Sequence, residues 1–399
     1  MSTGIGNLVL GDSTTSSQQS FTVIKKLGYG SFSSVFLCDW HGDLSPEVLP
    51  GLTSHIRGGA DQPGVRLVAV KTLRRKWEQS LHECEDLKEL KALRAITPHP
   101  CVVHFYDVFL ASEMSELSFV FEAMEGNLIH FMKSRKRRPL ATGLVAHMFQ
   151  QMASGLHHIH SSGYFHRDMK PENILITTTG IFNYRSLFSQ SQPDAVEQKD
   201  VSVICKIADF DLAREISSTP PYTEYVSARW YRAPEVLLLS RDYSMPVDLW
   251  ALGTIIAELV NLRPIFPGSG QIDQINRIVN VLGDPADHGV DEHGRPRGGG
   301  PWPRGLEQAR RVAFIFPEAE PRNLYAMFDN QTPRRLVECI SDLLKYDPVL
   351  RITSQQCLVH NYLRECLPEN LPCMLPEPEL HAQQSSIPQD SHAVSESPN

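Results

Sequence analysis

The sequence predicts an α+β fold, with strands in the first third of the chain and helices in most of the remainder. Apolar runs rich in β-forming residues indicate strands at 21–26, 35–40 and 67–71. Leucines recur near one face of the stretch 84–93, which predicts a helix. A second, longer helix is predicted for 140–161.

Length and composition are those of a globular protein. The chain has 399 residues, of which 41% are hydrophobic and 21% charged. The net charge of −8 argues against nucleic acid as a partner, since phosphate neutralisation needs a basic face. The eight cysteines form no Cys-x-x-Cys pair, so neither a zinc site nor a disulfide framework is predicted. Without a signal pattern or an apolar run of about 18 residues, we expect no membrane partner and an intracellular location, in cytoplasm or nucleus.

The most informative stretch, 165–173, carries an acid, a lysine and a carboxamide at fixed spacing. Asp168 is suited to orient a substrate hydroxyl and accept its proton, and Asn173 to hold a magnesium ion. Lys170 is suited to steady a phosphate during transfer. The stretch resembles the catalytic loop of eukaryotic protein kinases. A chance match of nine residues is improbable, so the resemblance is informative.

A glycine-rich segment lies upstream of this loop, at 27–35. Gly28 and Gly30 allow close approach of the backbone to phosphate, and Ser33 stands where a third glycine is usual. A dinucleotide-binding Rossmann turn would need a helix directly after the glycines, whereas 35–40 is rich in β-formers. The segment therefore resembles the kinase loop that covers the phosphates of ATP.

Lys71 ends the apolar run 67–71 and matches the kinase lysine that holds the α- and β-phosphates. Glu89, in the predicted helix 84–93, is expected to pair with it. Glu85 is the alternative, because the helix register is uncertain by one turn.

Asp209 lies in a stretch that resembles the magnesium-binding segment of kinases. The resemblance implies that Asp209 is a metal ligand. Asp211 stands where glycine is usual in that segment. We expect Asp211 to stiffen the turn and to add negative charge near ATP, while both metal ligands remain.

Further kinase-like segments follow in the expected order. The stretch 227–235 resembles the end of an activation segment, and 248–253, which begins with Asp248, resembles the helix that anchors the catalytic loop. Arg351 is expected to form a buried pair with Glu235 and not to lie at the surface. Arg232 is expected to shape a pocket that prefers proline after the phosphorylated residue.

The resemblance implies a bilobal protein kinase fold over residues 21–363. A small, mostly β N-lobe with one key helix (21–122) would precede a larger, mostly α C-lobe (123–363), between a flexible N-terminus (1–20) and a disordered tail (364–399). It implies ATP and Mg²⁺ as cofactors, with Phe121 behind the ATP pocket. Implied ATP-binding residues are Leu27, Gly28, Gly30, Val35, Ala69, Lys71, Glu122 and Met124.

The sequence of residues 230–235 resembles that of the group of cyclin-dependent and MAP kinases. The stretches 213–216 and 220–227 resemble the male-germ-cell-associated and intestinal-cell kinases and the fungal inducer-of-meiosis kinases. Kinases of that family phosphorylate serine or threonine, with arginine upstream and often proline nearby. The resemblance also suggests a link to meiosis or development. The region around Glu89 shows no cyclin-binding signature, so we expect no cyclin partner. The resemblance also implies protein substrates, an upstream activating kinase and a monomer.

Thr223 and Tyr225 have the Thr-x-Tyr form of dual-phosphorylation kinases, with Arg167 and Arg232 as receivers of the phosphates. Glu224 between them is typical of extracellular-signal-regulated MAP kinases, so a MAP kinase proper is the alternative. A pseudokinase scaffold is a second alternative, favoured by Asp211, Ser33 and insertions predicted at 41–66, 178–202 and 283–305.

Two other features have an ordinary interpretation. His157, His158 and His160 have no acidic or cysteine ligand beside them, which favours helix-surface and packing roles over a metal site. The basic run 133–138 is more typical of a solvated loop than of a nuclear import signal or an acidic docking patch.

Overall fold

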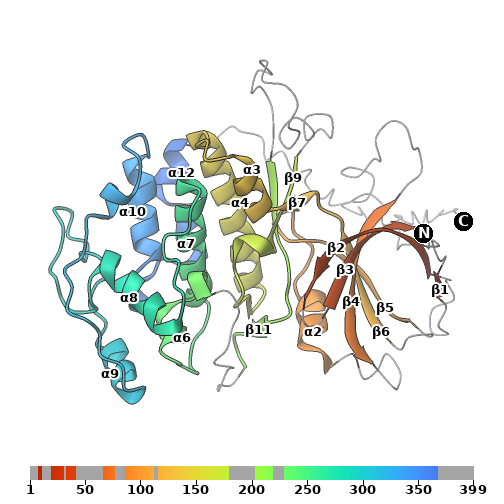
Figure 1. The fold of residues 1–399 in the computed structure, drawn as a ribbon, viewed down its shortest axis with the longest axis horizontal. Helices are drawn as coiled ribbons and strands as arrows, with labels where there is room; N and C mark the ends of the chain where they lie inside the picture. Colours follow the sequence, from red (N-terminus) through yellow and green to blue (C-terminus); the bar gives the residue numbers. More distant parts are fainter. Residues whose placement is uncertain are drawn as a thin grey trace, which may run out of the picture. The chain divides into compact units, whose positions relative to one another are not determined.

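The computed structural model describes residues 8–10, 19–30, 33–41, 66–76, 84, 86–111, 116–178, 203–218 and 229–366. All of them belong to one compact unit, Met1–Pro368 (Figure 1). Most of the predicted insertions at 41–66 and 178–202 lie outside the described residues.

The N-lobe is a six-stranded antiparallel sheet in the order β1-β2-β3-β4-β6-β5 (Figure 1). The strands are β1 (Leu8–Leu10), β2 (Gln19–Tyr29), β3 (Ser33–Trp40), β4 (Leu67–Lys76), β5 (Phe105–Ala111) and β6 (Glu116–Glu122). The three strands predicted from the sequence lie within β2, β3 and β4. Strand β1 lies within the segment predicted to be flexible, where three apolar residues pair with the start of β2.

In the described part of the N-lobe the helix is α2 (Lys88–Ala95), which begins four residues later than the predicted stretch 84–93. The backbone at Leu87 is extended, with φ −63° and ψ 124°, and no side chain caps the first turn. Leu90 and Leu93 are buried as their spacing predicts. The helix therefore presents its apolar face, and with it Glu89, to the interior.

The C-lobe is mostly helical, and two small antiparallel sheets complete it. Its helices are α3 (Leu128–Ser134), α4 (Thr142–Ser161), α6 (Pro234–Leu237), α7 (Pro246–Asn261), α8 (Gln271–Leu282), α9 (Pro303–Arg311), α10 (Arg334–Leu343), α11 (Ser354–Leu358) and α12 (Asn361–Cys366). The short strands are β7 (Gly126–Asn127), β8 (Tyr164–Phe165), β9 (Ile174–Thr178), β10 (Val203–Ile207) and β11 (Arg214–Glu215). The 3₁₀ turns among its described residues are η2 (Pro171–Asn173), η3 (Arg229–Tyr231), η4 (Leu324–Met327) and η5 (Pro348–Leu350).

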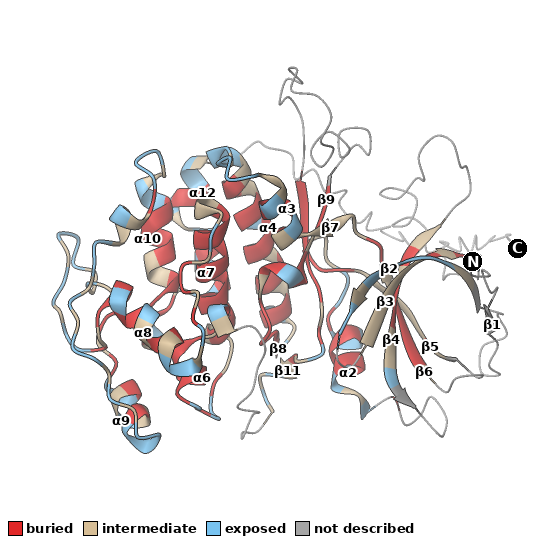
Figure 2. Ribbon diagram, viewed as in Figure 1, coloured by how far each residue is buried: buried red, intermediate tan, exposed pale blue. Residues whose placement is uncertain are grey.

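Helix α7 is the centre of the C-lobe, and Figure 2 shows it buried along most of its length. A helix that is apolar on all sides is typical of such a position. A Cβ added at Gly253 would lie 2.8 Å from the Cβ of Leu343 on α10, so this glycine permits the close approach of the two helices. The long predicted helix at 140–161 is α4, and α9 begins inside the predicted irregular segment 283–305.

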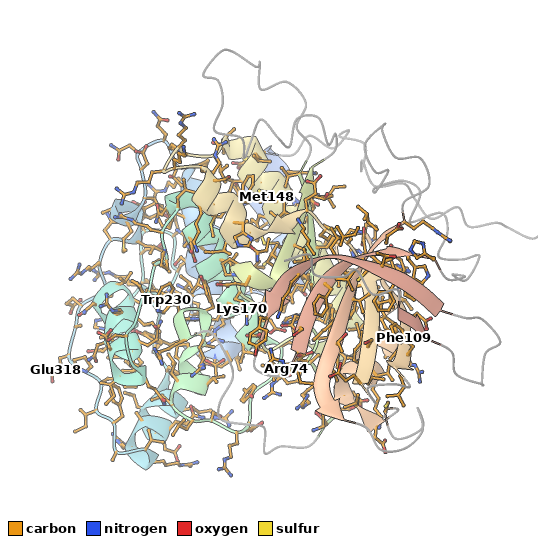
Figure 3. All side chains as sticks on the ribbon, turned by 45° about the vertical axis from the view of Figure 1, so that its right-hand side comes forward. Arg74, Phe109, Met148, Lys170, Trp230 and Glu318 are labelled. Carbon is orange, nitrogen blue, oxygen red and sulfur yellow. The ribbon has the colours of Figure 1, made fainter. Side chains whose placement is uncertain are left out.

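Two apolar clusters stabilise the described structure. The smaller one lies within the sheet and includes Trp40 and Phe109; the larger one runs from α2 through the C-lobe and includes Met148. Figure 3 shows Phe109 among the strands and Met148 among the helices. No helix in the described ranges combines the length and the apolar content needed to cross a membrane.

Two histidines of α4 contact residues that are distant in the sequence. His158 Nε2 lies 2.8 Å from the carbonyl oxygen of Thr97, and its ring stacks on that of His99 at 4.6 Å between centroids. His160 contacts Asp248 and Ser354. These contacts are the packing roles expected for the histidines.

Candidate active site

The predicted catalytic loop lies between β8 and β9, with Lys170 labelled in Figure 3. Lys170 Nζ donates to Asp168 Oδ2 at 2.7 Å. Asn173 Nδ2 donates to both Asp168 O, at 2.9 Å, and Asp168 Oδ2, at 3.0 Å. The structure therefore brings the three predicted residues together, and the amide oxygen of Asn173 remains for other contacts.

Asp248, at the start of α7, holds this loop from below. It accepts the backbone N–H groups of His166 and Arg167, both at 2.8 Å, and lies 3.0 Å from His160 Nε2. Arg167 has a φ of 71°, in the left-handed region that costs energy for a non-glycine residue. Burial raises the pKa of Asp248, but the His160 contact and the other donors outweigh it and lower the pKa. A carboxylate that stays ionised therefore fixes an unfavourable backbone conformation.

Lys71, on β4, is the other centre of the site. Its Nζ donates to Glu89 Oε1 at 2.8 Å and to Asp209 Oδ1 at 3.1 Å, and also to Asp211 Oδ1. Burial lowers the pKa of Lys71, but the three carboxylates outweigh it and raise the pKa. The structure thus brings Lys71 to Glu89, while Glu85 lies outside the described residues.

The carboxylates around Lys71 respond to burial and to the ammonium group. Burial raises the pKa of Glu89, and Lys71 opposes this effect. For Asp209 burial also raises the pKa, but Lys71 lowers it more, so the pKa lies below its ordinary value. Glu89, Asp209 and Asp211 form the one group of three potential metal ligands found in the described residues, and Lys71 contacts all three.

The oxygen atoms of Asp209 and Asn173 fit a magnesium ion, which prefers hard carboxylate and carbonyl ligands. Their two segments meet directly, because Ala208, next to Asp209, donates its backbone N–H to Asn173 O at 2.9 Å. The donor set is therefore suited to magnesium bound together with phosphate oxygens.

The predicted nucleotide-binding residues of the N-lobe lie on adjacent strands. Val35 is in register with Gly28 on one side and with Lys71 on the other, and Ala69 is in register with Phe121. Leu27 and Gly30 also belong to this end of the sheet, whereas Ser31 and Phe32 lie outside the described residues. The glycine-rich segment is thus positioned two strands from Lys71.

The segment that joins the lobes contains Glu122, which ends β6, and Met124, which is partly buried. The buried carboxylate of Glu122 accepts from Lys206 Nζ at 2.7 and 2.6 Å. Lys206 lies on β10, three residues before Asp209, so this ion pair ties the connection to the segment that carries the proposed metal ligand. Sequence reasoning missed Lys206; a lysine in an otherwise apolar, fully buried strand was the available signal.

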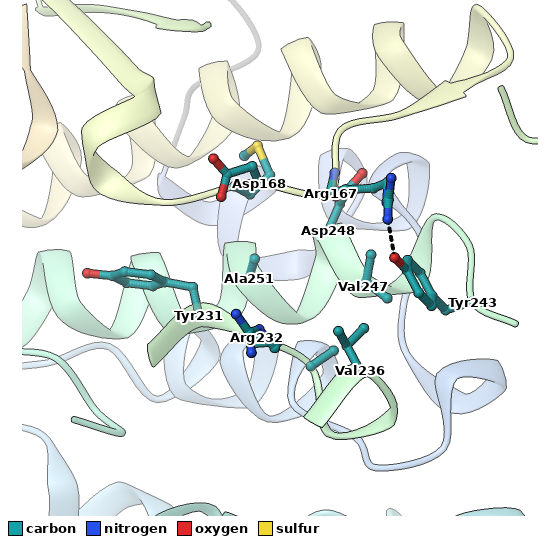
Figure 4. A pocket seen from close by; sticks show the side chains of 11 residues that line it. Arg167, Asp168, Tyr231, Arg232, Val236, Tyr243, Val247, Asp248 and Ala251 are labelled. Atoms are coloured by element: carbon teal, nitrogen blue, oxygen red, sulfur yellow. Dashed lines mark hydrogen bonds between the residues drawn. The ribbon is translucent and has the colours of Figure 1, made fainter. Parts of the chain in front are cut away.

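A pocket beside the catalytic loop contains Arg167 and Arg232, the two predicted receivers of phosphate (Figure 4). Arg167 donates to the hydroxyl of Tyr243, and to Leu212 O at 3.1 Å. The predicted phosphorylation sites Thr223 and Tyr225 lie outside the described residues.

Arg351 and Glu235 form a bidentate pair, with both N–O distances 2.6 Å. Arg351 also donates to the carbonyl oxygens of Lys345, Tyr346 and Pro246. Both side chains are almost fully buried, at 0% and 4% exposure. The structure therefore places the predicted pair in the interior.

Comparison with known proteins agrees with this geometry. The family model of the protein kinase domain matches residues 50–363. The chain is 40% identical to cyclin-dependent kinase F-3 of Oryza sativa subsp. japonica over 316 residues, which is 79% of the chain and 62% of the relative. It is 37% identical over 344 residues to serine/threonine-protein kinase MAK of Mus musculus and to serine/threonine-protein kinase ICK of Rattus norvegicus, in each case 86% of the chain and 45% of the relative. The chain therefore spans about half the length of the curated relatives it matches.

Proposed function

The chain belongs to the protein kinase family, and we propose that it transfers the γ-phosphate of ATP to serine or threonine hydroxyls of protein substrates. The observation that carries this proposal is a series of contacts: Lys71 donates to Asp209, Asn173 donates to Asp168, and Ala208, next to Asp209, donates to Asn173 O. Similarity to the MAK and ICK kinases supports the family placement predicted from the sequence.

The proposed mechanism relies on positioning ATP and the acceptor hydroxyl and on neutralising the charge of the phosphates. Lys71, oriented by Glu89, binds phosphate oxygens beneath the glycine-rich segment. Asp168 orients the acceptor hydroxyl and takes its proton, and Lys170 neutralises charge on the transferred group. Magnesium, when bound by Asp209 and Asn173, supplies further neutralisation of the phosphate charge.

Phosphorylation of Thr223 and Tyr225 by an upstream kinase is the proposed activating event. Each phosphate adds about −1.5 to −2 charge and so favours docking on guanidinium groups. Arg167 and Arg232 line one pocket and supply two such groups. The pocket beside Arg232 is the proposed site for the residue that follows the phosphorylated one.

Two alternatives remain distinct from this proposal. A MAP kinase proper shares the Thr-Glu-Tyr form, and substrate selection by proline alone, without upstream arginine, would favour it. A scaffold without catalysis is favoured by Asp211 and Ser33. Such a scaffold has no need of the complete set of catalytic residues.

The test is transfer of labelled phosphate from ATP to a generic basic substrate and to a peptide array, with magnesium present. Asp168→Asn keeps the size of the side chain and removes the base, so transfer should fall by about 10²- to 10⁴-fold. Glu318→Gln, at an exposed position distant in sequence from every catalytic segment, serves as the control and should keep full activity. Undiminished transfer in Asp168→Asn would contradict the assigned role, and no transfer by doubly phosphorylated wild type would favour the scaffold.

A further inference from the structure

Asp211 contacts the proposed catalytic lysine directly, although glycine is usual at its position in the resembled segment. Its Oδ1 accepts from Lys71 Nζ, across 140 residues of sequence. The turn stiffening predicted from the sequence would involve the backbone alone. The contact gives this aspartate a role that a stiffened turn does not explain.

The donors of the Lys71 ammonium group are fully used in this arrangement. An ammonium group has three N–H donors and no acceptor. Glu89, Asp209 and Asp211 each accept from Nζ. A phosphate oxygen can therefore bind Lys71 by hydrogen bond only after one of the three carboxylates has moved away.

The three carboxylates differ in how easily they can leave. The side chain of Glu89 is 8% exposed and lies on the buried face of α2, where an unpaired charge would be costly. The side chain of Asp209 is 36% exposed, but Asp209 lies at the proposed metal position, so it is needed beside the phosphates. Asp211 is 38% exposed, and solvent can compensate its charge when it turns outward.

We propose that Asp211 is an internal competitor of ATP for Lys71: its carboxylate holds the ammonium group and must be displaced when phosphate binds. This inference rests on the proposed function, because it concerns the same nucleotide site. Asp211 is then a positioning residue, which keeps Lys71 oriented before ATP binds and weakens ATP binding in exchange. A glycine at this position would do neither.

The competition predicts an effect that is confined to ligands with phosphate groups. Adenosine has no group that needs Lys71, so its affinity should be independent of Asp211. ATP must displace the carboxylate, so its affinity should rise when the carboxylate is removed. The difference between these two ligands separates competition from a general change in the shape of the site.

The experiment measures dissociation constants of ATP with magnesium and of adenosine by calorimetry, for wild type, Asp211→Asn and Asp211→Gly. Asp211→Asn keeps the side-chain volume and removes the charge, whereas Asp211→Gly also frees the backbone. We expect both variants to bind ATP about 3- to 10-fold more tightly, in the range of a partly exposed ion pair, with adenosine affinity unchanged.

The matched control is Asp86→Asn, which removes a carboxylate that pairs with Lys91 at 92% side-chain exposure in the same lobe. It changes the net charge equally and should leave the affinity for ATP unchanged. Thermal unfolding of each variant confirms that the fold is retained.

Unchanged or weaker ATP binding in Asp211→Asn would overturn the proposal; weaker binding would instead indicate that Asp211 helps to hold the metal. An equal change for adenosine and ATP would also overturn it, because the effect would then not depend on phosphate. Failure of the proposed function is seen separately, as absence of phosphate transfer in the wild type. Normal transfer combined with unchanged affinities would reject the competition alone.

Discussion

The two sides of the proposed active site handle charge in different ways. Beneath the proposed catalytic loop, two buried charges have their own sets of partners: Arg351 makes a bidentate contact with Glu235, and Asp248 accepts from backbone donors. At the junction of the lobes a single ammonium group, that of Lys71, is shared by Glu89 of the N-lobe and by Asp209 and Asp211 of the C-lobe.

The contacts that hold the proposed catalytic loop therefore form a fixed frame, whereas the contacts around Lys71 can be rearranged. Fully paired charges hold the catalytic loop in one conformation before substrate arrives, which is the preorganisation that phosphoryl transfer requires. Shared charges on the nucleotide side can exchange partners when a polyanion enters. The proposed acceptor side therefore has fixed contacts, whereas the proposed nucleotide side has contacts that can exchange.

The largest test of this contrast is Arg351→Met. The substitution leaves the carboxylate of Glu235 buried without its cation, so the free energy of unfolding should fall by about 3–5 kcal/mol, measured by urea denaturation. Arg277→Met is the matched control, since Arg277 pairs with Asp273 at 44% and 37% side-chain exposure. It should cost less than about 1 kcal/mol. Equal losses of unfolding free energy in both variants would show that the buried pair of Arg351 with Glu235 contributes no more than the exposed pair of Arg277 with Asp273.

Much of the fixed frame could be predicted from the sequence. The residues from 165 to 173, Lys71, Asp209 and the kinase-like order of the segments indicated the bilobal fold and the family. Such motifs are local, so the spacing of side chains along the chain already limits their geometry.

The contacts that distinguish this chain could not be predicted in the same way. Lys206 with Glu122 and Lys71 with Asp211 join residues 84 and 140 positions apart, and no periodic pattern marks such pairs. The start of α2 was placed too early because leucine spacing identifies a helical face but not its first turn. Strand β1 was missed because three apolar residues in a polar segment are a weak signal.

Asp248→Asn tests whether the frame depends on charge at a single carboxylate. Asparagine has one acceptor oxygen, so it cannot serve both backbone N–H groups and His160 as the carboxylate does. We expect a loss of about 2–3 kcal/mol in the free energy of unfolding. At saturating ATP the kcat should fall while the KM for ATP changes little, because Asp248 does not touch the nucleotide side.

Asp347→Asn provides the control for this substitution. Asp347 also accepts a backbone N–H, from Val349 at 3.0 Å, but at an exposed 3₁₀ turn where asparagine caps equally well. Its stability and kinetics should match the wild type. A large effect there would mean that the loss at Asp248 is a general consequence of replacing aspartate.

The last effect appears only as the pH changes and concerns Glu258, a buried acid of the C-lobe that accepts from the neutral hydroxyl of Tyr231, at 2.7 Å. Burial raises the pKa of Glu258 from 4.5 to about 7, the Tyr231 hydrogen bond opposes this, and Glu172 adds to it. The unfolded chain therefore releases this proton near its ordinary pKa while the folded chain keeps it. The contribution of Glu258 to stability should be greatest below about pH 4.5 and should decrease as the pH rises to about 7, by on the order of 3 kcal/mol.

Glu258→Gln removes this titration, so its unfolding free energy should lack that decrease when both proteins are measured by urea denaturation between pH 4.5 and 8. Tyr231→Phe supplies the matched change, because it deletes the hydrogen bond that favours the ionised carboxylate. The pKa of Glu258 should then rise further, and the decrease in stability should extend to higher pH. Identical pH profiles in the wild type and Glu258→Gln would show that Glu258 is ionised in the folded protein. The C-lobe would then hold a buried charge without a cation, and the contrast with Lys71 would fail at this position.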